Sequence, residues 1–223
     1  MKIVIDIGGS ILASPEPNLE YIKNFAEFLV ELSKKNEVFV VVGGGEVARK
    51  YISVAKKLGA RDEYCDEIGI LATKLNAMLL VASLEKLAKT NKKIPNSIEE
   101  VPCNQKIFIM GGTKPGQTTD AVAAGIARKC KADLLVIATN VDGIYEEDPK
   151  KNPLAKRFEK LSFSELLELV KNYKHEPGFS MVIDRTAAKI IAKDRIKTVV
   201  INGKKIENIK KAIEEQKGDT VIG

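Results

Sequence analysis

The chain has 223 residues, of which 44% are hydrophobic and 30% are charged, with a net charge of +6. This length can bury a full core in one large domain or two small ones, and the composition is typical of a soluble globular protein. Lys and Arg are spread along the chain without an aromatic-rich basic patch, so we expect no nucleic-acid partner.

The cysteines Cys65, Cys103 and Cys130 are far apart and form no C-x-x-C pair. This pattern predicts neither a disulfide framework nor a zinc site, and it favours a reducing cytoplasm. The N-terminal apolar run is short, contains Asp6 and ends in glycines, so we expect a strand and not a signal peptide. We expect no apolar segment of the length of a membrane span, and therefore no membrane partner.

Predicted strands and helices alternate along the chain. Apolar runs predict strands at 3–7, 38–42, 106–110, 133–138, 197–201 and 220–222. Apolar residues at helical spacing predict helices at 19–34, 46–58, 66–87, 119–130, 163–173, 183–193 and 206–214. A polar connection with a short helical turn is expected over 91–105, and an irregular excursion or hairpin over 144–160. This alternation predicts an α/β fold with a mostly parallel central sheet.

Glycine and hydroxyl residues follow three of these strands. The three turns are Gly8-Gly9-Ser10, Gly43-Gly44-Gly45, and the longer segment from Gly111 to Thr119. Glycine lets the backbone approach a phosphate closely, and the first N–H groups of a following helix lack intrahelical partners. Because the carboxyl ends of parallel strands share one edge of a sheet, the three turns together predict a polyphosphate site there. Arg49, about one helical turn after the second glycine turn, could bind a phosphate through two N–H groups of its guanidinium.

Three alternative sites fit the sequence less well. The segment Gly111-x-x-x-x-Gly116-Gln117-Thr118 nearly matches a P-loop, but Gln117 stands where that motif requires Lys. Gly43-x-Gly45-x-x-Ala48 matches a dinucleotide fingerprint, but the acids at 62 and 63 follow a helix instead of ending a strand. The chain has one histidine, His175, in a polar stretch, so a Ser/His/Asp hydrolase is not expected.

Phosphoryl transfer fits this chain best, because it needs positioning and positive charge instead of a covalent nucleophile. We expect Mg²⁺ held mainly by ATP phosphates and water, and we assign no protein ligand to the metal. The polar run Thr139-Asn140-Val141-Asp142-Gly143, with Tyr145 just after it, could contact a base or ribose. Asp66 stands near the start of a long helix, where the dipole favours a carboxylate.

Taken together, these residues resemble the amino acid kinase family, and within it the archaeal type of UMP kinase. The resemblance is carried by the three glycine turns, Arg49, Asp66, the segment from Met110 to Asp120, the run from Thr139 to Gly143, and Ile183-Asp184. It implies a three-layer αβα sandwich and a cytoplasmic homohexamer, a trimer of dimers. The implied activity is transfer of the γ-phosphate of ATP to UMP in pyrimidine nucleotide biosynthesis. It also implies one domain over 1–223, with an acceptor-binding lobe near 1–105 and an ATP-binding lobe near 106–223.

The same resemblance implies roles for individual residues. Arg49, Asp184 and Ser10 are implied as catalytic residues, with Asp184 matching the family's aspartate that organises the reaction centre. The implied ATP contacts are Gly9, Ser10, Gly45 and Arg49 at the phosphates, and Thr139, Asn140, Tyr145 and Asp148 at the adenosine. The implied UMP contacts are Gly44, Asp66, Thr113, Lys114, Pro115, Gly116, Gln117, Thr118 and Thr119.

The chain departs from the family pattern at Asp6, where many members have Lys. The transition-state charge would then come from Arg49 and Mg²⁺, or from Lys114. A kinase for another small phosphate, such as isopentenyl phosphate, is an alternative, although no histidine lies near the second glycine turn. A non-catalytic nucleotide-binding or oxyanion-binding protein of the same fold is another, and the missing lysine supports it. The choice among UMP, CMP and dUMP and the response to effectors stay open.

Overall fold

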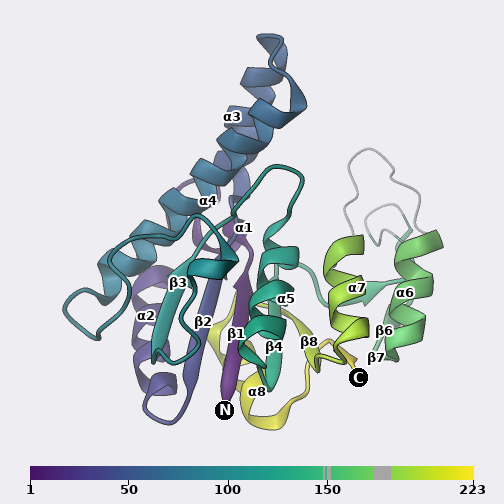
Figure 1. The fold of residues 1–223 in the computed structure, drawn as a ribbon. Coiled ribbons are helices and arrows are strands. Elements are labelled where there is room, and N and C mark those ends of the chain that lie inside the picture. Colours follow the sequence, from purple (N-terminus) through teal and green to yellow (C-terminus); the bar gives the residue numbers. More distant parts are fainter. Residues whose placement is uncertain (148, 150–151, 173–181) are drawn as a thin grey trace.

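The computed structural model describes residues 1–147, 149, 152–172 and 182–223, in which a seven-stranded sheet lies between two layers of helices (Figure 1). Asp148 and His175 lie outside the described residues. The strands are β1 (Lys2–Ile7), β2 (Glu37–Val42), β3 (Ile107–Met110), β4 (Leu134–Thr139), β5 (Ile144–Tyr145), β6 (Arg157–Phe158), β7 (Lys160–Leu161), β8 (Thr198–Asn202) and β9 (Thr220–Ile222). The helices are α1 (Gly9–Leu12), α2 (Leu19–Ser33), α3 (Gly45–Lys57), α4 (Asp62–Leu84), the 3₁₀ turn η1 (Ile98–Glu100), α5 (Thr119–Cys130), α6 (Phe163–Asn172), α7 (Arg185–Lys193) and α8 (Ile206–Glu215).

The sheet has the order β3-β2-β1-β4-β8-β9-β7, and its first five strands are parallel. Strand β9 pairs antiparallel with β8, and β7 pairs parallel with β9. The order of strands along the chain reverses between β1 and β4, which is the switch point where parallel α/β sheets bind ligands. The prediction of an α/β fold with a mostly parallel sheet is therefore confirmed.

Each face of the sheet buries its own apolar cluster. Ile3, Ile5 and Ile7 of β1 pack with residues of α2, α4 and α8. Val4 of β1 points to the other face, where it packs with residues of α5, α6 and α7. Because side chains alternate along a strand, Asp6 shares the face of Val4. Two cores on opposite faces make the three-layer αβα sandwich that the family resemblance implied.

Two elements were not predicted from the sequence. Helix α1 forms a single turn directly after the first strand, where a simple glycine turn was expected. Strand β7 is only two residues long and joins the sheet through β9, so it has no apolar run by which to be recognised. The predicted excursion contains a hairpin, in which Ile144 pairs with Phe158 and Tyr145 with Arg157.

The structure contains a disulfide between Cys103 and Cys130, and this corrects the expectation that the cysteines form no bridge. Cys103 precedes β3, whereas Cys130 ends α5. Their Cα atoms lie 5.0 Å apart although 27 positions separate them in the chain. The fold, and not the spacing, brings the two residues together. Cys65 is a buried free thiol.

Helix α4 corrects a second expectation, because it is long and apolar enough to cross a membrane by length and composition. One such helix is weak evidence of a span, since core helices pass the same test. Ala77, Leu80 and Leu84 of α4 are buried in the core beneath the sheet. Thr73 and Asn76, two polar residues in the middle of the helix, are buried as well. The expectation was wrong because it looked for an uninterrupted apolar run. Helix α4 contains polar residues, but apolar side chains on both its buried side and its exposed side raise its mean hydropathy.

Candidate active site at the carboxyl edge of the sheet

The first two glycine turns lie against each other at the carboxyl edge of the sheet. A Cβ atom added to Gly9 would lie 2.2 Å from the carbonyl oxygen of Gly43 and 2.3 Å from the nitrogen of Gly45. Gly45 also has φ +62°, a conformation that residues with a side chain rarely adopt. These glycines are therefore needed for the contact between the turns, and the contact brings the starts of α1 and α3 together.

Backbone hydrogen bonds fix the same turns to the ends of three strands. The N–H of Gly43 donates to the carbonyl of Ile7 at 2.9 Å, and the N–H of Gly8 donates to the carbonyl of Ala138 at 2.9 Å. The ends of β2, β1 and β4 are thus held in register at one edge. This is the arrangement that the sequence predicted for a polyphosphate site.

Two polar residues of α4 hold the second and third turns. The side-chain amide of Asn76 donates to the carbonyl oxygens of Gly43 and Gly44, at 2.9 and 3.2 Å. The hydroxyl of Thr73 accepts from the N–H of Gly112 at 2.6 Å and donates to the carbonyl of Ile70. Sequence reasoning missed both residues, and the signal that could have found them is their place in the middle of an otherwise apolar helix.

Asp66 and the third turn come together as predicted. The carboxylate of Asp66 accepts a hydrogen bond from the N–H of Gly116 at 2.8 Å, across 50 positions of sequence. Within the turn, the hydroxyl of Thr113 donates to the side-chain oxygen of Gln117 at 2.8 Å. Gly116 has φ +73° and open space around it, so glycine is favoured here by the backbone conformation of the turn and not by a close contact. Gln117, which stands where a P-loop would have Lys, therefore closes the turn on itself.

The end of this turn joins the start of α7. Thr118 caps α5 by accepting from the N–H of Ala121, and its hydroxyl donates to the carboxylate of Asp184. Asp184 in turn caps α7, because its other oxygen accepts from the N–H groups of Thr186 and Ala187 at 2.6 and 3.1 Å. Both oxygens of Asp184 thus accept hydrogen bonds, which tie the start of α7 to the start of α5.

Two further acids lie beside Asp184. Burial raises the pKa of Asp6 well above its usual range, and the charge of Asp120, a hydrogen bond with it and the charge of Asp184 raise it further. Burial also raises the pKa of Asp120 to about 6, while its hydrogen bond with Asp6 acts in the opposite direction. Asp6 is 3% exposed, at the end of β1. Asp120, in the first turn of α5, was not singled out as a site residue from the sequence.

The predicted adenosine contacts lie around the ends of β4 and β8. Thr139 pairs with Asn202 across these strands, and the carbonyl of Thr139 accepts from the N–H of Gly203 at 2.8 Å. Asn140 is exposed just beyond, and Tyr145 is half-buried in the β5/β6 hairpin. Because Ala138 bonds directly to Gly8, this group adjoins the first glycine turn. Asp148, the fourth predicted contact, lies outside the described residues.

The predicted cationic groups are exposed. Arg49 lies on α3 one turn after Gly45, and Lys114 lies in the third turn. Ser10 is half-buried in α1, beside the contact between the first two turns. Neither Arg49 nor Lys114 forms a salt bridge with another described residue, so both side chains can adjust to a ligand.

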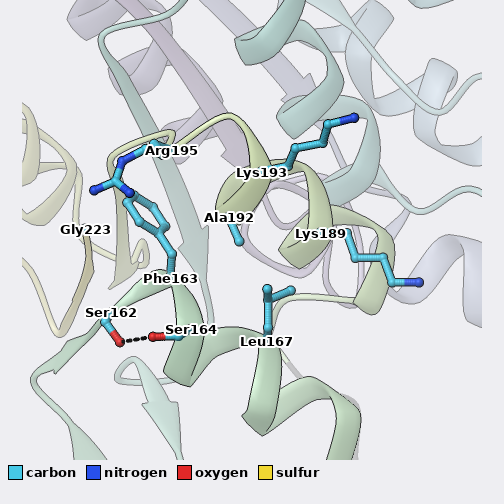
Figure 2. A pocket seen from close by; sticks show the side chains of 9 residues that line it. All are labelled: Ser162, Phe163, Ser164, Leu167, Lys189, Ala192, Lys193, Arg195 and Gly223. Carbon is cyan, nitrogen blue, oxygen red and sulfur yellow. Dashed lines mark hydrogen bonds between the residues drawn. The ribbon is translucent and has the colours of Figure 1, made fainter.

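A cavity of about 740 Å³ lies elsewhere, lined in part by α6 and α7 (Figure 2). Ser162 follows β7 and Gly223 follows β9, strands that run opposite to β8, so the cavity lies near the edge opposite the glycine turns. Lys189 and Lys193 point away from Leu167 and Ala192, and the Arg195 guanidinium lies 5.4 Å from the ring centre of Phe163. No predicted site residue lines this cavity, and it is separate from the candidate active site.

Comparison with known proteins gives the same family throughout. The model of the amino acid kinase family matches residues 1–202. The chain is 45% identical to a uridylate kinase from Archaeoglobus fulgidus over the whole of both chains, and 45% identical to one from Thermococcus kodakarensis over 100% of this chain and 99% of that protein. The crystal structure of the Archaeoglobus fulgidus uridylate kinase superposes with a TM-score of 0.88 at 45% identity, with full coverage of both chains.

The family model matches residues 1–202, and this range contains the three glycine turns and the α4 residues that hold them. A dehydrogenase is not supported, because Asp62 begins α4 instead of ending a strand. The chain belongs to the amino acid kinase family.

Proposed function

We propose that the protein is a UMP kinase, which transfers the γ-phosphate of ATP to UMP to give ADP and UDP in pyrimidine nucleotide biosynthesis. The observation that carries the proposal is the hydrogen bond from Gly116 to Asp66. It joins the turn after β3 to α4, beside the two glycine turns that contact each other. The named uridylate kinases at 45% identity over the full chain support the same activity.

The two nucleotides would lie end to end along the carboxyl edge of the sheet. Gly9, Ser10 and Gly45 present the backbone of two helix starts to the ATP phosphates, where N–H groups and the helix dipoles favour an anion. Thr139, Asn140 and Tyr145 lie on the side of the switch point where adenosine would bind. Residues 113–119 and Asp66 would hold UMP, with Gly44 between the two nucleotides. The division into an acceptor lobe near 1–105 and an ATP lobe near 106–223 is part of this proposal.

The transfer itself needs alignment and charge. An oxygen of the UMP phosphate attacks the γ-phosphorus of ATP, the bond from that phosphorus to the β,γ-bridging oxygen breaks, and ADP leaves. Mg²⁺ bound to the ATP phosphates would neutralise part of their charge. Among the described residues, no group of three His, Cys, Asp or Glu side chains could hold a metal ion, which is compatible with a metal held mainly by phosphates. Asp184 would act by fixing Thr118 and the start of α7 beside the reacting groups.

Arg49 is the proposed source of positive charge from the chain, because it follows Gly45 by one helical turn. Replacing Arg49 by Ala should lower turnover on the order of a hundredfold, as the loss of a charge-stabilising donor does. Lys50→Ala is the matched control, since Lys50 lies on the same helix and pairs with Glu46. Near-normal turnover in Arg49→Ala would remove Arg49 from the mechanism.

We also propose that the protein is a homohexamer, a trimer of dimers. Large apolar side chains are exposed on one side of α3 and on one side of α4, at helical spacing on each. We call this the α3/α4 apolar surface; its residues are Tyr51, Val54, Leu58, Tyr64, Leu71, Leu75 and Met78. The paired helices extend beyond the carboxyl edge of the sheet, where a second copy could pack against them (Figure 1). Burial between two copies would remove this apolar area from water.

Light scattering after size-exclusion chromatography tests the assembly. The wild type should elute with six times the 24.4 kDa mass of the chain. Leu75→Glu should give a smaller species, because it puts a charge on a surface that is apolar. Leu154→Glu is the control, since Leu154 is 84% exposed and lies outside the surface. A hexamer that persists in Leu75→Glu would show that this surface does not carry the assembly.

The activity is tested by measuring ADP release with ATP and Mg²⁺ against UMP, CMP, dUMP, AMP and isopentenyl phosphate in parallel. We expect rapid turnover with UMP and little with isopentenyl phosphate. ATP binding without ADP release for any acceptor would contradict the proposal and favour a nucleotide-binding protein of the same fold. A cytoplasmic location is also proposed, as befits an enzyme that uses ATP and UMP.

A further inference from the structure

The last part of the chain contacts the loop at which we place the adenosine of ATP. This loop, residues 139–145, runs from the end of β4 into β5 and carries three of the proposed adenosine contacts. Asp219 and Thr220 lie against it, where β9 begins. Both follow residue 202, at which the match to the family model ends. No role was assigned to either residue from the sequence.

Thr220 joins the two strands of the β5/β6 hairpin. Its hydroxyl accepts a hydrogen bond from the N–H of Ile144 at 2.9 Å and donates one to the carbonyl of Phe158 at 2.5 Å. Ile144 and Phe158 are paired across the hairpin. Because Thr220 is 0% exposed, water cannot replace its hydroxyl in these contacts. This one side chain therefore fixes the end of the loop, next to Tyr145.

Asp219 joins the same hairpin to the end of β8. One oxygen of its carboxylate accepts from the N–H of Asn202 at 2.7 Å, and the other lies 3.5 Å from a guanidinium nitrogen of Arg157. Arg157 is the partner of Tyr145 across the hairpin. The two oxygens of Asp219 thus connect the hairpin with the strand that lies beside β4.

Asn202 and Gly143 complete the contact with the loop. The side-chain amide of Asn202 donates to the carboxylate of Asp142 at 2.7 Å. A Cβ atom added to Gly143 would lie 2.7 Å from the hydroxyl oxygen of Thr220 and 2.9 Å from the Cβ of Asp219. The backbone of the loop therefore packs directly on these two residues, with no room for a side chain between them.

We propose that Asn202, Asp219 and Thr220 are positioning residues, which hold the loop 139–145 in the conformation that binds the adenosine of ATP. A loop that is already ordered loses less conformational entropy when a ligand binds, so its loss of order would weaken ATP binding. The glycine turns proposed for the phosphates have other supports, in Ile7 and Asn76. The three residues should therefore affect the adenosine part of ATP and not its phosphates. This inference rests on the proposed kinase function.

Calorimetric titration without UMP tests it, with ATP and inorganic tripolyphosphate as the two ligands and Mg²⁺ present. Thr220→Val removes the hydroxyl at nearly the same shape; it should raise the Kd for ATP at least about tenfold and change that for tripolyphosphate less than about twofold. Thr198→Val is the matched control and should change neither Kd. Thr198 is also 0% exposed, but its hydroxyl donates to the carbonyl of Ile196, at the other end of β8. Thr220→Ser keeps the hydroxyl and should bind ATP like the wild type.

Two further measurements separate positioning from a general loss of structure. In the free protein, the N–H of Ile144 should exchange with solvent at least about tenfold faster in Thr220→Val than in Thr198→Val. In UMP turnover, KM for ATP should rise, whereas kcat at saturating ATP and KM for UMP should change less. If Thr220→Val does not fold, Asn202→Ala takes its place in the titration with the same expected split, because it removes the bond to Asp142 from a half-buried position.

The inference and the proposed function fail separately. Equal losses of ATP and tripolyphosphate affinity in Thr220→Val, or an ATP affinity equal to that of Thr198→Val, would overturn the inference. A wild type that binds ATP no better than tripolyphosphate would also overturn it, because adenosine would then contribute nothing. A wild type that prefers ATP, and loses this preference in Thr220→Val, but does not phosphorylate UMP would contradict the proposed function and leave the inference intact.

Discussion

Breaking the disulfide between Cys103 and Cys130 should lower the free energy of unfolding by about 3.5 kcal/mol. The bridge closes a loop with a sequence separation of 27 residues. In the chain-entropy description, a loop of this length loses about 12 cal/mol/K in the unfolded state, which is about 3.5 kcal/mol at 25 °C. The closed loop contains β3, the third glycine turn and the whole of α5, so the bridge also stabilises the segment that carries the proposed UMP contacts.

The assay is equilibrium unfolding in urea, with and without a thiol reductant. With a urea m-value of about 2.5 kcal/mol/M, the midpoint should fall by about 1.4 M on reduction. The double variant Cys103→Ser/Cys130→Ser should unfold near the reduced wild type and should not respond to reductant. Cys65→Ala is the control, because Cys65 is the free thiol and its variant should keep the full response.

Two results would refute the reasoning. One is a difference of less than about 1 kcal/mol between the oxidised and reduced forms, which lies far below the loop-entropy value. The other is titration of three free thiols in the protein purified without reductant, because the structure leaves only Cys65 unpaired.

Three further perturbations act on the candidate site. Thr73→Val should destabilise the protein by about 1 to 3 kcal/mol, because the buried N–H of Gly112 loses its acceptor, and it should also raise KM for UMP. Urea unfolding measures the loss, with Thr73→Ser as the matched control because serine keeps the hydroxyl. Equal stability of the two variants would disprove the prediction. Asp184→Ala should lower the free energy of unfolding by about 1 kcal/mol, because α7 loses its N-cap, and it should lower kcat, because Thr118 is no longer held. Asp194→Ala, at the other end of α7, should change neither the free energy of unfolding nor kcat. For pH, the folded-state pKa of Asp120, about 6, lies above its unfolded value, so the folded state binds more protons between the two. The stability that this group contributes is therefore fully present below the unfolded pKa and is lost as pH rises through about 6. Unfolding measured across this range should show a loss of about 3 kcal/mol that Asp120→Asn abolishes, and an equal loss in the variant would assign it elsewhere.

Much of the fold was determined by the sequence itself. Continuous apolar runs such as Val38 to Val42 cannot be exposed on either face, so they specify buried parallel strands. The periodic apolar residues of α2 and α8 specify helices that cover such strands. The three glycine turns were recognisable as one site because parallel strands end at a common edge, and the hydrogen bonds from Gly43 to Ile7 and from Gly8 to Ala138 confirm that edge. The family resemblance implied that Asp66 and residues 113–119 share one site, and the hydrogen bond from Gly116 to Asp66 shows that the two lie together.

Only the tertiary structure decided which distant residues meet. The sequence separation of Cys103 and Cys130 argued against a bridge, but the return of α5 along the sheet places their Cα atoms 5.0 Å apart. Thr73 and Asn76 looked like interruptions of an apolar helix, and their roles depend on how α4 crosses the second and third turns. From the sequence, Asp6 was noted only as a departure from the family's lysine, and Asp120 was not singled out as a site residue. Their pairing arises because β1 ends where α5 begins, and the sequence holds no local pattern that records such a meeting.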